Sequence, residues 1–258
     1  MDPTDTGLTP RDDLLTVIAV AALAACTTDL AHEALGHGSA CIASGGHISL
    51  LNNAIFACSI PSRLIALSGP IGNLAVGLLA YAVLGVISPQ RTILRLYALL
   101  VMAFSLFWEA GYLVEAMVTG VGDSLFAWRE WMGRETLIVR FTLAGIGILA
   151  YLIFWRMLQL KAAFLAGSTG RARFVLRPAW SAGVALMLAA AAFYVPDRIG
   201  AMRDAALSIA ASFPLLFTAP PTTADSEPAP LIRRDLRVIS LGGVAALAFA
   251  VTLGRGLY

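Results

Sequence analysis

Apolar residues follow one another along this chain in long runs, and polar residues mostly separate the runs. Six runs have about the length, roughly 20 residues, that crosses a bilayer as a helix. Their approximate bounds are 13–43, 63–87, 93–120, 136–160, 178–195 and 236–254. Proline, glycine or charge separates them, as is typical of helix ends. The pattern predicts an all-α polytopic membrane protein with about six transmembrane helices.

Two segments depart from this pattern. Residues 45–59 begin with two glycines and continue through alternating or β-branched residues around Asn52 and Asn53. This predicts a small β-hairpin after the first helix, with the two asparagines in its turn. Residues 201–217 form a helix-like run that Pro214 interrupts. An interfacial or re-entrant helix and a membrane span both fit that segment.

The composition supports an integral membrane protein. The chain is 59% hydrophobic and 13% charged, whereas soluble domains are about 25% charged. A net charge of +2 is too small to favour nucleic acid as a partner. The expected surroundings are the lipid bilayer, and we expect the bacterial cytoplasmic (inner) membrane.

The ends and connections add three expectations. Residues 1–12 form an N-terminal tail, whose aspartates are the opposite of a cleavable signal's positive start. Residues 219–230 are rich in proline, threonine and alanine, which predicts a flexible linker. Basic residues in 156–177 favour a cytoplasmic location for that loop, but the arginines of 197–237 nearly balance them. The orientation therefore stays open.

The chain has three cysteines, Cys26, Cys41 and Cys58. Their number is odd, and no two of them have C-x-x-C spacing. We therefore expect packing residues within membrane helices and no disulfide.

His32, Glu33 and His37 place two imidazoles and a carboxylate beside the first apolar run. Ionisable groups at membrane depth are costly, so they are functional by default. In the zinc-hydrolase pattern H-E-x-x-H the two histidines lie about 40° apart around a helix. Here the second histidine comes one residue later, at roughly 140° on an ideal helix. A π-bulge with Ala34 as the inserted residue would bring them together.

Two other geometries remain open. Asp29, Glu33 and His37 form one stripe of an undistorted helix, in which Glu33 would be a ligand and not a base. The two histidines could also be buried without metal, bonded to helical carbonyls.

The segments HEALGHGSACIASGGHISL (32–50) and LSGPIGNL (67–74) resemble the site-2 protease family of intramembrane zinc metalloproteases. That family carries H-E-x-x-H on its first core helix, then a small hairpin, a helix with Gly-Pro-x-x-Asn, and an aspartate ligand from a third core helix. The order is kept over about residues 20–130. The resemblance implies a metalloprotease-like membrane core over 13–130, with additional transmembrane helices in 131–258.

By position, the resemblance implies that His32, His37 and Asp123 bind zinc and that Glu33 is the general base. The family's fuller aspartate motif is absent, since Ser124 follows Asp123, and a turn aspartate is the alternative. Asn73 matches the family's asparagine, which holds an extended substrate strand. A hydrogen bond between helices is the alternative for Asn73.

Three further residues could assist a metal site. Glu109 or Glu115 could orient a ligand such as His37, or make an ordinary polar contact within the bundle. His47 could replace Asp123 as the third ligand, although a position on the hairpin surface is favoured.

The sequence thus predicts a membrane-embedded zinc metalloendopeptidase that hydrolyses a peptide bond in a membrane-anchored protein substrate. The alternative is a non-proteolytic binding or regulatory protein on the same scaffold. The extra residue between Glu33 and His37 supports that alternative.

Overall fold

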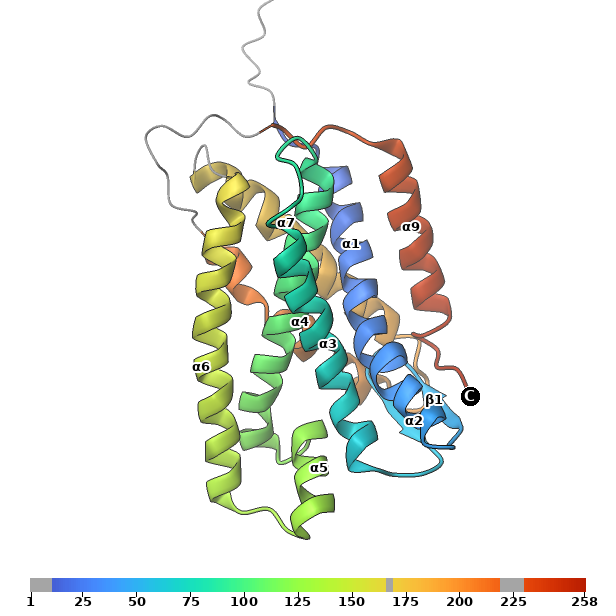
Figure 1. Cartoon of the computed structure of the whole chain (residues 1–258). Helices are drawn as coiled ribbons and strands as arrows, with labels where there is room; N and C mark the ends of the chain where they lie inside the picture. The colour runs from blue at the N-terminus through green and yellow to red at the C-terminus, as the bar shows by residue number, and fades with distance from the viewer. Residues whose placement is uncertain (1–10, 166–168, 219–229) are drawn as a thin grey trace, which may run out of the picture.

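A computed structural model describes residues 11–165, 169–218 and 230–258 (Figure 1). The elements in chain order are α1 (Leu14–Leu30), η1 (Ala31–Gly38), α2 (Ser39–Ala43), β1 (Ile48–Leu51), β2 (Phe56–Cys58), α3 (Arg63–Val83), α4 (Thr92–Thr119), α5 (Asp123–Met132), α6 (Leu137–Lys161), η2 (Ala162–Leu165), α7 (Thr169–Ala191), α8 (Arg198–Ala210), η3 (Phe213–Phe217) and α9 (Leu236–Val251). Most of the predicted tail 1–12 and of the linker 219–230 lies outside the described residues.

Five helical segments within the described part of the chain are long and apolar enough to cross a membrane. They are Leu14–Ala43, Arg63–Val83, Thr92–Thr119, Leu137–Leu165 and Gly170–Ala191. Together they correspond to the first five predicted runs, and the sixth run corresponds to α9, which has 16 residues. The all-α fold with apolar spanning helices and a small hairpin is confirmed. These helices indicate an integral membrane protein, while the number of spans stays a prediction.

The centre of the bundle is α4. It is flanked by α1, α3, α6 and α8, so its upper part is buried on every side. Phe104 and Phe107 are completely buried there. A helix that is apolar all round belongs in such a position. The lower part of α4 continues toward α5 (Figure 1).

The segment 201–217 is a broken helix covered by protein. α8 ends at Ala210, a short turn follows, and Pro214 lies at the start of η3 as its second residue. The carbonyl of Ala211 accepts from the Tyr151 hydroxyl, and that of Leu216 accepts from Arg177 Nε. Through these contacts the segment packs against α6 and α7, and it returns toward the end of the bundle where α7 begins. Irregular backbone at membrane depth requires such cover.

The hairpin forms as predicted. β1 and β2 are antiparallel, and Asn52 Oδ1 accepts from the backbone N–H groups of Ala54 and Ile55 in the turn. Leu257 exchanges two backbone hydrogen bonds with Leu51, so the carboxyl terminus covers the outer edge of β1.

The expectation for the cysteines is wrong at two positions. Cys41 on α2 and Cys58 on β2 form a disulfide. The hairpin folds β2 back over α2, and this long-range contact is not encoded in a local spacing pattern. Cys26 is a buried free cysteine, as the packing interpretation predicts.

Candidate metal centre

The first spanning helix changes from α to π geometry over η1. Hydrogen bonds in a π-helix reach five residues back, so one extra residue is absorbed without shifting the flanking turns. His32 Nε2 and His37 Nε2 therefore lie 3.2 Å apart. The predicted bulge is confirmed. The alternative stripe through Asp29, Glu33 and His37 is wrong, because it requires an undistorted α-helix.

Glycines let α3 approach the backbone of η1. A Cβ on Gly36 would lie 2.6 Å from the Cα of Gly69, and a Cβ on Gly72 would lie 2.5 Å from the carbonyl oxygen of Ala31. Both distances are too short for any side chain. The Ser-Gly-Pro-Ile-Gly segment that carries the family resemblance thus acts here as a flat packing surface beneath the histidines.

Asp123 reaches the site from the turn between α4 and α5. Gly120 (φ 68°) and Gly122 (φ 126°) take conformations that side chains disfavour, and Asp123 follows as the first residue of α5. Asp123 Oδ2 lies 3.3 Å from His32 Nε2 and 3.4 Å from His37 Nε2. Asp123 therefore joins both histidines, but it begins α5 and does not belong to the third core helix, α4, as the resemblance implies.

The three ligand atoms have the spacing of a metal site. A tetrahedral ion at about 2.0–2.1 Å from each atom would separate them by about 3.3 Å. The observed separations are 3.2, 3.3 and 3.4 Å. His32, His37 and Asp123 could therefore hold a metal ion.

The other ring nitrogens fix the tautomers. His37 Nδ1 lies 2.6 Å from the carbonyl oxygen of Ile65, and His32 Nδ1 lies 3.0 Å from Glu109 Oε1. Both oxygens are acceptors, so both Nδ1 atoms donate and the neutral rings present Nε2 lone pairs. Two Nε2 atoms and a carboxylate oxygen then face one another. Such a group of acceptors is stable only with a cation among them, either a proton or a metal ion.

Glu109 and Asn73 support His32 from behind. Asn73 Nδ2 donates to Glu109 Oε1 over 2.8 Å, and Asn73 is completely buried. A carboxylate that accepts from a ligand histidine holds the ring in place and raises its basicity. Glu109 thus orients a predicted ligand, although it is His32 and not His37. Asn73 makes the interhelical hydrogen bond, and its contact with substrate stays a prediction.

Aromatic rings close the sides of the site. Trp108 stacks on His32 with ring centroids 4.6 Å apart, and Phe56 of the hairpin stacks on His37 at 5.2 Å. Sequence reasoning missed both rings. Trp108 could have been found, because it is the neighbour of the candidate residue Glu109 on the same helix, α4.

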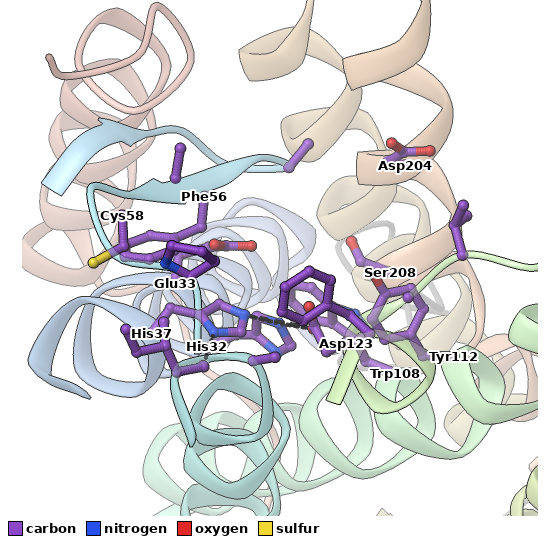
Figure 2. Close-up of a pocket in the computed structure, with 18 of the residues that line it drawn as sticks. His32, Glu33, His37, Phe56, Cys58, Trp108, Tyr112, Asp123, Asp204 and Ser208 are labelled. Carbon is purple, nitrogen blue, oxygen red and sulfur yellow. Dashed lines mark hydrogen bonds and ion pairs between the residues drawn. The ribbon is translucent and has the colours of Figure 1, made fainter. Parts of the chain in front are cut away.

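Glu33 lies beside the ligands in a cleft of about 470 Å³. Its side chain is 4% exposed, and its Oε2 has no hydrogen-bond partner among the described residues. Figure 2 shows Phe56 and Cys58 of the hairpin on one side of the cleft, and Tyr112, Ser208 and Asp204 on the other.

Two remaining candidates lie outside the ligand group. His47 is exposed on the hairpin, as the favoured interpretation holds. Glu115 lines the cleft, but no hydrogen bond or ion pair of the described residues joins it to a ligand.

Asp123 is the ligand outside the spanning helices. Burial alone would raise the pKa of its carboxyl group. When a proton is the cation among these groups, hydrogen bonds and charge from His32 and His37 outweigh burial and hold this pKa below its usual range. Asp123 is therefore an anionic group at neutral pH, as a metal ligand must be.

Comparison of the chain with models of known protein families, with curated proteins and with solved structures found no significant match. The interpretation of the site therefore depends on its own geometry.

Proposed function

We propose that this protein is a membrane-embedded zinc metalloendopeptidase, similar to the site-2 protease family, that cleaves a membrane-anchored protein. The observation that carries the proposal is the convergence of His32, His37 and Asp123 to separations of 3.2–3.4 Å. That convergence occurs at a π-helical turn that also places the buried carboxylate of Glu33 beside them.

The ligand spacing favours zinc over magnesium. Neighbouring ligands at right angles around an octahedral ion at about 2.1 Å would lie about 3.0 Å apart. The separations in this site are longer and match a tetrahedron. Two imidazoles and one carboxylate are also a typical catalytic zinc set, which leaves a fourth position for water or substrate.

The chain's own residues have distinct tasks in hydrolysis. When bound, zinc supplies a Lewis acid that polarises a carbonyl and lowers the pKa of water to about 7. Glu33 accepts a proton from the attacking water and delivers it to the leaving amide nitrogen. Within the part of the chain that the structure describes, β2 pairs with β1 alone, and it borders the cleft through Phe56, Ala57 and Cys58. An unwound substrate segment can pair with its free edge.

Metal content tests the first part of the proposal. The purified protein should hold about one zinc per chain, as a single site with three protein ligands implies. His32→Ala should lose it, whereas His47→Ala, at an exposed histidine of the same chain, should retain it. Elemental analysis after removal of loosely bound ions measures both. Purified protein that folds but contains no zinc at this site contradicts the proposal.

Separation of binding from chemistry tests the second part. Glu33→Gln should keep the zinc and abolish cleavage of a membrane-anchored reporter, because the amide cannot accept the proton. Glu130→Gln, at an exposed position on α5, is the matched control and should cleave normally. Continued cleavage by Glu33→Gln would show that Glu33 is not the base.

A further inference from the structure

The bundle has two chemically different ends. At the amino-terminal end, α1, α4, α7 and α9 begin and α3 and α6 finish (Figure 1). Asp12 joins these elements: it pairs with Arg171 of α7 and accepts from the backbone N–H of Ile232 before α9. The hairpin end contains β1, β2 and α5, and the carboxyl terminus pairs with β1 there.

The Cys41–Cys58 disulfide lies at the hairpin end. Structural disulfides persist in oxidising compartments and are rare where glutathione and thioredoxin keep thiols reduced. The free cysteine of the described residues, Cys26, is buried in α1 instead. The disulfide therefore indicates that the hairpin end faces an oxidising compartment.

The distribution of charge supports the same orientation independently. Because α8 and η3 run back through the bundle, residues 197–237 do not lie on one side. Arg198 and Arg203 are at the hairpin end, whereas Arg233, Arg234 and Arg237 are at the amino-terminal end. The amino-terminal end also carries Arg11, Arg91, Arg95, Arg156, Lys161, Arg171, Arg173 and Arg177, in its connections and in the helix turns next to them. Such an excess of basic residues marks the cytoplasmic side.

The hairpin end carries fewer basic residues, namely Arg63, Arg129, Arg134, Arg140, Arg198, Arg203 and Arg255. Arg129 and Arg140 both pair with Glu135, and Arg203 pairs with Asp204. The balance of basic residues that left the orientation open in the sequence thus disappears once α8 and η3 are placed.

We propose that the amino-terminal end lies in the cytoplasm and that the metal cleft opens to the extracytoplasmic, oxidising side of the membrane. The cleft is lined by the hairpin, by the start of α5 and by Asp204 of α8, all at the hairpin end. His32 lies 18 residues beyond Leu14, so the ligands are about 27 Å along the helix from its cytoplasmic start.

This orientation names a substrate class, and that step rests on the proposed function. The substrate is a membrane-anchored protein whose cleavable segment is presented at the extracytoplasmic end of its own membrane helix. A segment at the cytoplasmic end would be separated from the ligands by most of the bundle.

Accessibility of single thiols tests the orientation. Ser88 and Glu130 are exposed at the amino-terminal end and the hairpin end respectively. The native background suits the experiment, because Cys26 is buried and the other two cysteines are paired. In intact cells a membrane-impermeant maleimide should label Glu130→Cys, and Ser88→Cys only after permeabilisation. Labelling of Ser88→Cys, or protection of Glu130→Cys, in intact cells overturns the proposal.

The redox state of the unmodified chain is a second measurement that needs no variant. Cells are quenched with acid and free thiols are alkylated before digestion. Peptides containing Cys41 and Cys58 should be recovered as one disulfide-linked species. Recovery of both as alkylated free thiols overturns the oxidising location.

Two reporters distinguish this inference from the proposed function. Both are single-span proteins with the same glycine-rich unwinding segment, placed near the extracytoplasmic end in one and near the cytoplasmic end in the other. Cleavage of the first alone is expected. Cleavage of the second alone overturns the substrate class while proteolysis stands. Cleavage of neither overturns the proposed function, while the orientation found by thiol labelling stands.

Discussion

Two spanning segments of this protein have nearly the same hydropathy and opposite environments. An 18-residue stretch of Leu14–Ala43 has a mean hydropathy of 2.0, and one of Leu137–Leu165 has 2.2. Within the protein, 67% of the first stretch is buried but only 11% of the second. Mean hydropathy measures whether a helix can enter a bilayer. It does not tell whether lipid or protein surrounds the helix.

The polar residues make the distinction that hydropathy misses. Asp29, His32, Glu33 and His37 are all buried in the first segment. In α6 the buried residues are Ala144, Gly147 and Leu158, and large apolar residues such as Phe141 and Leu149 are exposed. Polar groups at membrane depth need partners that lipid cannot offer, so their presence places the first segment inside the bundle.

The largest difference between the two segments should appear when one methyl group is added to a glycine. A Cβ on Gly69, which packs against the first segment, would lie 2.3 Å from His37 Nε2 and 2.8 Å from His32 Nε2. Gly69→Ala should therefore displace both rings and reduce bound zinc from about one per chain to a small fraction. Overpacking should also lower the free energy of unfolding by about 1–3 kcal/mol.

Gly145 of α6 is the matched control, because no described atom outside its own stretch of helix lies within 4 Å of its added Cβ. Gly145→Ala should keep its zinc and unfold at the same denaturant concentration or slightly higher, since alanine favours helix over glycine. Elemental analysis measures the zinc content of both variants, and denaturant unfolding in detergent micelles measures their stability. Equal loss of zinc in the two variants would contradict the close packing of Gly69 against the ligands.

A smaller effect is expected from the groups behind His32. Glu109→Ala removes the carboxylate that accepts from His32 Nδ1, and loss of such partners typically weakens metal affinity about 10–100-fold. Asn73→Ala, one contact further from the ring, should weaken it less. A chelator competition titration measures these affinities.

Glu115→Ala provides the control on the same helix. Glu115 lines the cleft without a described contact to a ligand, so zinc affinity should not change. An equal loss of affinity in Glu115→Ala and Glu109→Ala would show that general charge, and not the contact with His32, stabilises the site.

The sequence predicts local features of this molecule well. The spacing of His32 and His37 allows both to bind one metal ion only if the helix bulges between them, and the π-helical turn is present. Asn52 and Asn53 mark a turn because an asparagine side chain bonds its own backbone two residues on. The apolar runs predict the spanning helices because bilayer thickness sets their length.

The features that sequence cannot predict depend on how elements pack. Glu109 and Glu115 are equivalent candidates until the rotation of α4 against η1 is known. The Cys41–Cys58 pair requires the hairpin to fold over α2. The return of the chain through α8 and η3 requires a broken helix covered by α6 and α7. Each depends on contacts between residues far apart in the chain.

The smallest effect should follow from the deletion of Ala34. The sequence interpretation takes this residue as the one inserted into a regular helix, and its deletion restores the spacing of H-E-x-x-H. The π turn should revert to α geometry with its flanking turns in place. His32, His37 and Asp123 should then still converge, and zinc content should stay near one per chain. Deletion of Ala22, in the regular part of α1, is the matched control. It has no bulge to absorb it, so it turns the preceding residues by about 100° relative to the site and should destabilise the bundle. If the Ala34 deletion loses zinc while the protein still folds, the π turn does more than accommodate one residue, and the ligand geometry depends on it directly.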